Sequence, residues 1–125
     1  MEPRKILVVD SSKAMHRLFE LALRQHRLIY ATDGREALAL LRDHLDVDLV
    51  LTALNMLDMN GLELLAELRK LDGEAPPVVV VWTEGHEEEA TTALRSGAAD
   101  SIKKPFAPEE LAALIARLPS QPDGE

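Results

Sequence analysis

The segment DLVLTALNMLDMNG, residues 48–61, has the pattern of a buried strand, a short loop and a helix start. Leu49, Val50 and Leu51 form a continuous apolar run, which is typical of a strand covered on both faces. In α/β proteins the residue at the carboxyl end of such a strand lies at the ligand-binding edge of the sheet. Ala53 occupies that position here, and its methyl group offers no acid, base or nucleophile. The segment therefore predicts a site whose central position lacks reactive chemistry.

Similar apolar runs alternate with segments of helical period along the chain. The predicted strands are residues 6–9, 28–30, 49–51, 78–81 and, more weakly, 101–102. The predicted helices begin near Ser11 or Ser12, after Gly34, after Gly61, near Glu87 with an end at Gly97, and before Leu111. Their apolar stripes are Met15, Leu18, Phe19 and Ala22; Ala37, Leu38, Leu41 and Leu45; Leu62, Leu65 and Leu68; and Leu111, Leu114, Ile115 and Leu118. This alternation predicts an α/β fold with a doubly wound parallel sheet.

Composition limits the classes of protein that fit. The 125 residues are 46% apolar and only 3% aromatic, so Leu, Val and Ala must fill a single core. The absence of cysteine excludes disulfides and thiolate metal sites and fits a reducing compartment. A net charge of −8 argues against nucleic-acid binding. No apolar run approaches the ~18 residues of a membrane span or resembles a signal peptide, so we expect a cytoplasmic protein.

The end of the chain differs in composition from the rest. Residues 119–125 read PSQPDGE, which cannot bury apolar area. We expect one folded domain over residues 1–118, followed by a disordered tail or the stub of a linker.

Chemistry-bearing side chains follow three of the predicted strands, and Ala53 follows a fourth. Because the carboxyl ends of parallel strands meet at one edge of the sheet, we expect an acid, a hydroxyl and a lysine to converge around Ala53. The residues at these strand ends are Asp10 and Ser11, Ala53, Trp82 and Thr83, and Lys104 followed by Pro105.

Five motifs in register carry a resemblance to a known family. They are ILVVD at 6–10, TDGREAL at 32–38, NGLELL at 60–65, SGAAD at 96–100 and KKPF at 103–106. Over residues 4–118 the chain resembles a response-regulator receiver domain of two-component signalling. The resemblance implies a flavodoxin-like (βα)5 fold with strand order 2-1-3-4-5.

The resemblance also implies a phosphorylation site. In the family, an acid pair after the first strand holds Mg²⁺, and an aspartate ending the third strand accepts a phosphoryl group. A Thr or Ser after the fourth strand and the lysine of the KPF motif bind the phosphoryl oxygens, and that lysine's peptide bond to proline is typically cis. A side chain in the fifth strand, usually aromatic, reports the event.

The match to this site is uneven. Asp10, Lys104 and Pro105 are retained, and Asn55 fits the position whose backbone carbonyl would bind the metal. The departures are Ser11 at the second acid, Ala53 at the acceptor, Leu57 at a usual proline and Ser101 at the switch position. The fourth strand has two alignments: a gapless count from Gly97 places Trp82 at the Thr/Ser position, and a one-residue deletion places Thr83 there.

These departures predict a degenerate site. Ala53 cannot form an acyl phosphate, Thr52 should point to the opposite face of its strand, and Asp58 should be a solvated loop acid. With one carboxylate left, Mg²⁺ binding should be lost or very weak. Lys104 should then pair directly with Asp10. If Trp82 holds the Thr/Ser position, its ring should cover the site.

Other candidate residues have plainer interpretations. Ser11 is expected to be a helix cap rather than a nucleophile. The histidines at 16, 26, 44 and 86 lack metal-ligand spacing, and His16 is expected on an exposed helix face.

The main functional hypothesis is a receiver-like signalling module that works by phosphorylation-independent protein–protein interaction and is not an enzyme. Family behaviour implies a partner surface on the fourth helix, fifth strand and fifth helix, with Thr91, Arg95, Lys103 and Glu109 exposed. The partner would be a histidine kinase, an output domain or another signalling protein. Two alternatives stay open: a phosphorylatable receiver with an engineered Ala53, and a small α/β ligand-binding domain or enzyme. The last is disfavoured because the first turn, DSSKAM, has no glycine-rich phosphate loop.

Overall fold

Strands and helices alternate from end to end of the computed structural model, which describes residues 3–56, 59–71 and 75–118. The described strands are β1 (Lys5–Val9), β2 (Arg27–Ala31), β3 (Leu49–Ala53), β4 (Val78–Trp82) and β5 (Asp100–Lys103). The described helices are α1 (Lys13–Ala22), α2 (Gly34–Asp43), α3 (Gly61–Arg69), α4 (Glu87–Arg95) and α5 (Pro108–Arg117). Each predicted strand and helix is present, which confirms the α/β prediction.

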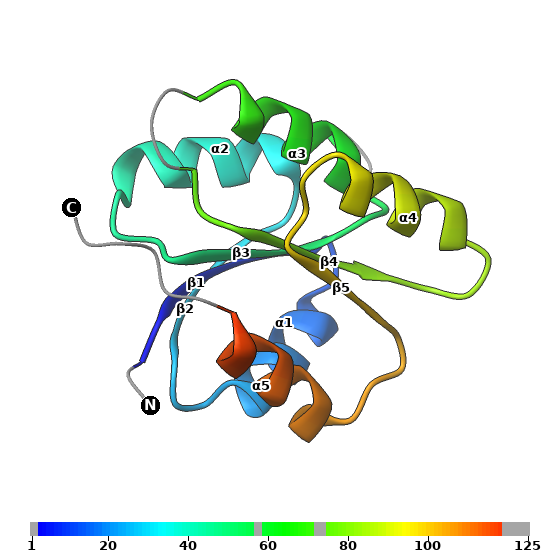
Figure 1. Cartoon of the computed structure of the whole chain (residues 1–125). Helices are drawn as coiled ribbons and strands as arrows, with labels where there is room; N and C mark the ends of the chain where they lie inside the picture. The colour runs from blue at the N-terminus through cyan, green and yellow to red at the C-terminus, as the bar shows by residue number, and fades with distance from the viewer. Residues whose placement is uncertain (1–2, 57–58, 72–74, 119–125) are drawn as a thin grey trace.

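The strands form one parallel sheet in the order β2-β1-β3-β4-β5. Helices α2, α3 and α4 cover one face of the sheet, and α1 and α5 cover the other (Figure 1). This is the flavodoxin-like, doubly wound arrangement that the sequence predicts. Its ligand-binding edge is the carboxyl end of the strands.

The two faces of the sheet carry separate apolar cores. The α2–α4 core includes Leu7, Val9, Val50, Val78 and Val80 of the strands together with Leu64 and Leu68 of α3. The α1/α5 core includes Ile6, Val8, Leu51, Val79 and Val81 of the strands together with Phe19, Leu111 and Ile115. Because consecutive residues of β1, β3 and β4 alternate between these cores, each strand must be apolar along its length.

Side-chain caps set the helix starts. Ser12 accepts a hydrogen bond from the backbone of Met15, so Ser12 is the N-cap of α1. Ser11, the other expected cap, is exposed and lies before it. Asp33 caps α2 in the same way, and Asn60 forms a capping box with Glu63 at the start of α3.

Gly61 allows α3 to begin directly beside the end of β3. The backbone N–H of Gly61 donates to the carbonyl of Leu54 at 2.9 Å. A Cβ at position 61 would lie 2.6 Å from the carbonyl oxygen of Ala53. Only glycine fits this approach without a shift of the backbone.

Two of the predicted core residues are exposed. Leu18 is 37% exposed because the buried face of α1 is centred on Phe19 and Ala22. Leu45 is 89% exposed because α2 ends at Asp43, so its apolar stripe does not continue. Leu57, Asp58 and the predicted tail at 119–125 lie outside the described residues.

Candidate functional site

The carboxyl edge of the sheet brings the predicted site residues together. Ala53 is the last residue of β3, and it pairs with Val81 of β4. Asp10 follows β1, where its backbone N–H donates to the carbonyl of Ala31. Lys104 follows β5, and its backbone N–H donates to the carbonyl of Trp82 at 2.8 Å. Backbone hydrogen bonds therefore fix Asp10 and Lys104, which follow strands on opposite sides of β3.

Asp10 is a buried carboxylate that pairs with Lys104. Its side chain is 6% exposed, and Oδ1 accepts a hydrogen bond from the backbone N–H of Ser12 at 2.9 Å. Oδ2 lies 3.6 Å from Nζ of Lys104 and has no hydrogen-bond partner among the described residues. This is the direct ion pair expected when the acceptor acid is missing.

Ala53 presents only a methyl group to this edge. The residue is 7% exposed, so little space is left for a side chain to reach in from elsewhere. Thr52 is fully buried, and its hydroxyl donates to the carbonyl of Ala53 at 3.0 Å. Thr52 is two residues from both Val50 and Leu54, which belong to the α2–α4 core, so its side chain points to the same face as theirs. Thr52 therefore faces away from Asp10, as the alternation of strand side chains predicts.

The residues present do not fit a Mg²⁺ ion. One of Asp10's oxygens is taken by Ser12 and the other faces the ammonium of Lys104. Ser11 and Asn55 are exposed, and Ser11 brings no carboxylate. Within residues 3–56, 59–71 and 75–118 there is no group of three or more His, Cys, Asp or Glu that could hold a metal. Mg²⁺ normally needs one or two free carboxylates together with water or phosphate oxygens.

Trp82 is the last residue of β4, and Thr83 lies outside the strand in the following turn. The structure thus places Trp82, and not Thr83, at the strand end. The indole packs against the α2–α4 core. Val81, the partner of Ala53, faces the opposite core. A cover of Ala53 by the Trp82 ring stays a prediction.

The exposed side chain of Lys103 lies over the ring of Trp82. Its Nζ lies 5.5 Å from the ring centroid, a cation–π distance, and also donates to Glu84. This hydrogen bond raises the pKa of Lys103 and lowers that of Glu84. Nε1 of Trp82 is buried with no hydrogen-bond partner among the described residues. In β5, Ser101 pairs with Val80 and is half-buried on the same side of the sheet as Trp82.

His16 is a contributor to this edge that the sequence reasoning missed. It was expected on an exposed face, but it is half-buried and stacks on Tyr30 with 4.9 Å between ring centroids. Its Nε2 lies 2.7 Å from the carbonyl oxygen of Asp10. The sequence does contain a signal for this burial, because Phe19 and Leu23, three and seven residues later at helical spacing, are both buried.

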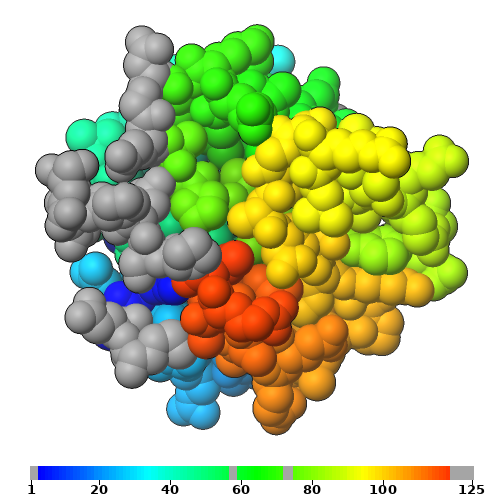
Figure 2. Space-filling view, in the orientation of Figure 1, coloured from blue at the N-terminus to red at the C-terminus, as the bar shows by residue number. Residues whose placement is uncertain are grey.

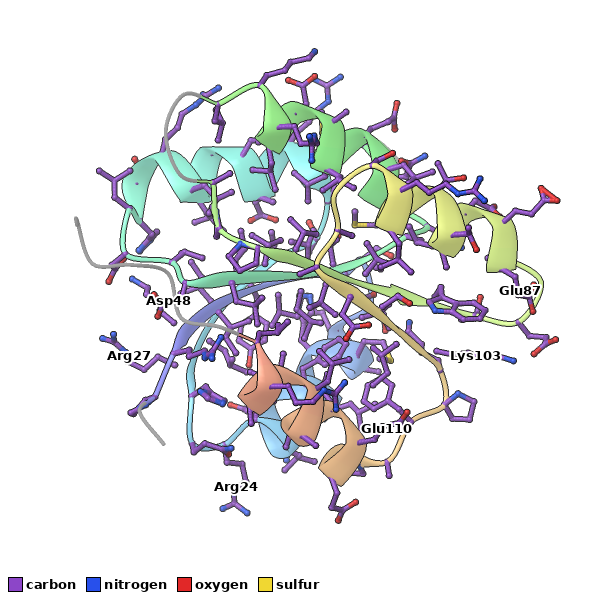
Figure 3. All side chains as sticks on the ribbon, in the orientation of Figure 1. Arg24, Arg27, Asp48, Glu87, Lys103 and Glu110 are labelled. Atoms are coloured by element: carbon purple, nitrogen blue, oxygen red, sulfur yellow. The ribbon has the colours of Figure 1, made fainter. Side chains whose placement is uncertain are left out.

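The loop after β5 has the expected cis proline, and the four residues named for the predicted partner surface are exposed. The Lys104–Pro105 peptide bond is cis, and Phe106 stacks on Phe19. The exposed members of the predicted surface are Thr91, Arg95, Lys103 and Glu109. Figure 3 shows Glu87 at the start of α4, Lys103 at the end of β5 and Glu110 at the start of α5 on the same side of the molecule.

A parallel sheet of order 2-1-3-4-5, with an acid and a lysine beside a cis proline at its carboxyl edge, defines a doubly wound domain with a receiver-type site. Residues 6–116 match the sequence model of the response regulator receiver domain. The chain belongs to this family.

Relatives of similar length support the assignment. The chain is 40% identical over 111 residues to a chemotaxis protein CheY homolog of Campylobacter jejuni, covering 86% of this chain and 85% of that protein. It is 35% identical to the chemotaxis protein CheY1 of Helicobacter pylori, covering 86% and 90%. Among solved structures, the receiver domain of NtrX from Brucella abortus superposes with a TM-score of 0.83 at 34% identity, covering 90% of this chain and 95% of that one.

No helix in the described part of the chain is long and apolar enough to cross a membrane.

Proposed function

We propose that this receiver domain acts in a two-component or phosphorelay pathway by binding a protein partner without being phosphorylated. The observation that carries the proposal is the Asp10–Lys104 ion pair beside Ala53. The family's acceptor position has no oxygen nucleophile, and the lysine that would bind phosphoryl oxygens already has a carboxylate partner. On this proposal the domain is not an enzyme, has no Mg²⁺ cofactor and works in the cytoplasm.

The proposed partner surface lies on α4, β5 and α5, and includes Thr91, Arg95, Lys103 and Glu109. A histidine kinase, an output domain or another signalling protein is the proposed partner. A partner can shift the conformations of the domain only by its differential affinity for them, because no covalent switch is available. Regulation then depends on the concentration of the partner.

Phosphoryl transfer provides the direct test. The purified protein is treated with acetyl phosphate and millimolar Mg²⁺, and the intact mass is measured. We expect no added phosphoryl group, and no change in amide chemical shifts with beryllofluoride. A covalent adduct at any residue, including Asp58 or Thr52, would contradict the proposal.

The same assay on Ala53→Asp separates natural divergence from an engineered Ala53. Because Ser11 supplies no second acid, a divergent site should bind Mg²⁺ poorly even with Asp restored. We therefore expect the variant to remain far less phosphorylated than Ala53→Asp combined with Ser11→Asp. Full phosphorylation of the single variant would favour the engineered alternative.

A further inference from the structure

The outer side of β2 carries backbone groups that the sheet does not use. Within the described residues β2 has β1 as its neighbour and stands at the edge of the sheet. The backbone N–H of Arg27 donates to the carbonyl of Arg4, on the β1 side, at 2.9 Å. Because backbone groups point to alternate sides along a strand, those of Leu28 and Tyr30 point away from β1. None of them has a hydrogen-bond partner among the described residues.

The adjoining residues limit this free edge to the length of a short strand. The backbone N–H of His26 donates to the carbonyl of Leu23, and that of Thr32 donates to the carboxylate of Glu36. The unpaired groups are thus those between residues 27 and 31. A row of this kind is a template on which another extended segment can form main-chain hydrogen bonds.

A hollow lies along the same edge, on the side of α1. Its volume is about 510 Å³, and the residues that line it include Leu28, Tyr30, Glu20, Arg24 and His26. In Figure 2 the light-blue residues of this region reach the outer surface at the lower left. A strand added to β2 would therefore place alternate side chains in this hollow.

His26 brings an unused hydrogen-bond donor to the hollow. The residue is only 7% exposed, and its Nδ1 accepts a hydrogen bond from the backbone N–H of Arg4 at 2.9 Å. The neutral ring must then carry its proton on Nε2. Nε2 is buried and has no acceptor among the described residues. Because an unpaired buried donor costs stability, a carboxylate that reaches His26 gains a favourable partner.

The charges around the hollow are unevenly placed. Arg24 and Arg27 are exposed, and neither forms an ion pair with any residue in the described ranges. Figure 3 shows both side chains projecting outward from the molecule. Glu20, one helical turn before Arg24, lies nearer Tyr30, and its charge adds to burial in raising the pKa of Tyr30. The amino end of β2 is therefore basic on a chain of net charge −8.

The other side of the same edge is apolar. Ile29 of β2 and Leu38 of α2 are half-buried and pack against the α2–α4 core. Side chains of an added strand alternate between the two sides of the sheet. A complementary segment therefore has acidic or polar side chains toward α1 and apolar side chains toward α2.

We propose that an extended segment of a partner protein adds to β2 as a further strand, with an acidic side chain at Arg24 and His26 and apolar side chains against Ile29. The backbone groups of Leu28 and Tyr30 hold the segment, and the hollow selects its side chains. An acidic partner suits this edge better than a second copy of the chain, because a second β2 would bring further arginines to it.

This inference goes beyond the proposed function and adds a second surface to it. The strands β2 and β5 form opposite edges of the sheet, so a segment bound to β2 leaves α4, β5 and α5 free. The domain would then connect two proteins without any covalent switch.

A short peptide tests the arrangement. The probe is the acetylated and amidated peptide TVEVT, whose symmetric sequence allows either strand direction. The full chain is titrated with it to millimolar concentration and followed by amide and imidazole NMR. We expect the amide protons of Leu28 and Tyr30 to shift and to exchange more slowly with solvent. The amide of Ile29, which faces β1, should keep its exchange rate, and the Nε2 proton of His26 should shift.

Charge exchange identifies the acidic contact. The peptide TVKVT should bind the unmodified chain roughly fivefold or more weakly than TVEVT, and Arg24→Glu should reverse this preference. Arg69→Glu on α3 is the matched control, because it makes the same change at an exposed residue far from β2. It should bind TVEVT like the unmodified chain.

Two results would overturn the proposal. One is that the amides of Leu28 and Tyr30 do not respond to TVEVT, or that both peptides bind equally well. The other is that these amides become protected as the chain alone is concentrated, since a second copy would then occupy the edge. Neither measurement involves Ala53 or Lys104, so this proposal and the proposed function fail separately.

Discussion

A carboxylate at position 53 would be nearly buried beside Asp10, which is itself buried. Two like charges about 4–6 Å apart at an effective dielectric near 20 repel by roughly 3–4 kcal/mol. We therefore expect Ala53→Asp to lower the free energy of unfolding by about this amount without metal, and millimolar Mg²⁺ to restore part of it. Urea denaturation with and without Mg²⁺ measures both effects.

Ala53→Asn is the control for side-chain volume, because it adds the same shape without the charge. Its stability should not depend on Mg²⁺. If Ala53→Asp is equally stable with and without Mg²⁺, the repulsion on which the prediction depends is absent.

The Asp10–Lys104 pair should contribute more than the surface ion pairs of this domain. Lys104→Met leaves a buried carboxylate whose Oδ2 has no hydrogen bond from the described residues, and we expect a loss of roughly 2 kcal/mol. A double-mutant cycle with Asp10→Asn, measured by urea denaturation, isolates the coupling between the two. The exposed Lys103–Glu84 pair, treated in the same way, should show no measurable coupling. Equal coupling in both cycles would show that burial of Asp10 does not strengthen its pair.

At the residue scale, the sequence was enough to predict the ion pair but not its surroundings. Asp10 and Lys104 could be predicted because both follow strands whose carboxyl ends must meet. Trp82 was ambiguous because a one-residue deletion in a loop changes whether Trp82 or Thr83 takes the family's Thr/Ser position. His16 was missed because its contact with the carbonyl of Asp10 depends on how α1 leans over the sheet, which the helical period alone does not specify.

At the element scale, the start of α3 depends on a glycine. Gly61→Ala would place a methyl group 2.6 Å from the carbonyl oxygen of Ala53, so backbone must move. We expect a loss of about 1–3 kcal/mol in the free energy of unfolding, the usual range for overpacking. Gly34→Ala, at the first position of α2, should cost less because its methyl group meets the side chain of Met59 rather than backbone. If urea denaturation shows equal losses of stability in Gly61→Ala and Gly34→Ala, the loss comes from placing alanine at a helix start and not from the contact with the carbonyl of Ala53.

His26, in the segment after α1, accepts a hydrogen bond from Arg4, the residue before β1. This hydrogen bond should be sensitive to pH. The backbone N–H of Arg4 donates to Nδ1 of His26 at 2.9 Å, which requires that nitrogen to be unprotonated. Burial and then the charge of Arg4 hold the pKa of His26 below its ordinary value. The unfolded chain therefore binds a proton more readily than the folded one, and stability should fall by about 1 kcal/mol from pH about 7 to about 5.5.

His26→Asn keeps an acceptor near the N–H of Arg4 but cannot titrate, so its stability should change less over the same range. Urea midpoints at several pH values provide the comparison. An identical pH dependence in the variant would mean that another group is responsible.

The element boundaries were predictable where a side chain defines them. Ser12, Asp33 and Asn60 each bond to the backbone of the first turn. The predicted starts, near Ser11 or Ser12, after Gly34 and after Gly61, lie within two residues of these caps. The exposed Leu45 shows the opposite case. Its spacing fits the stripe of α2, but the helix ends two residues earlier at Asp43, and no glycine marks that end.

At the scale of the whole molecule, the continuous apolar strands predicted a sheet covered on both faces. They did not by themselves predict which strands are neighbours, because β1, β3 and β4 are equally apolar and every parallel order buries them. The order 2-1-3-4-5 came from the family resemblance, and the hydrogen-bonded sheet confirms it.

The shared sheet should make both helical layers unfold together. Trp82, the only tryptophan, packs in the α2–α4 core, so its fluorescence reports directly on that layer alone. Leu64 in that core and Leu111 in the α1/α5 core are both fully buried, and Leu→Ala at either site should cost about 2–5 kcal/mol. Because β1, β3 and β4 contribute side chains to both cores, loss of either core removes the support of the sheet. We therefore expect Leu111→Ala to lower the urea midpoint seen by Trp82 as much as Leu64→Ala does, with coincident transitions in circular dichroism. If the urea midpoint of Trp82 fluorescence in Leu111→Ala is unchanged while the midpoint of circular dichroism falls, the two layers unfold independently.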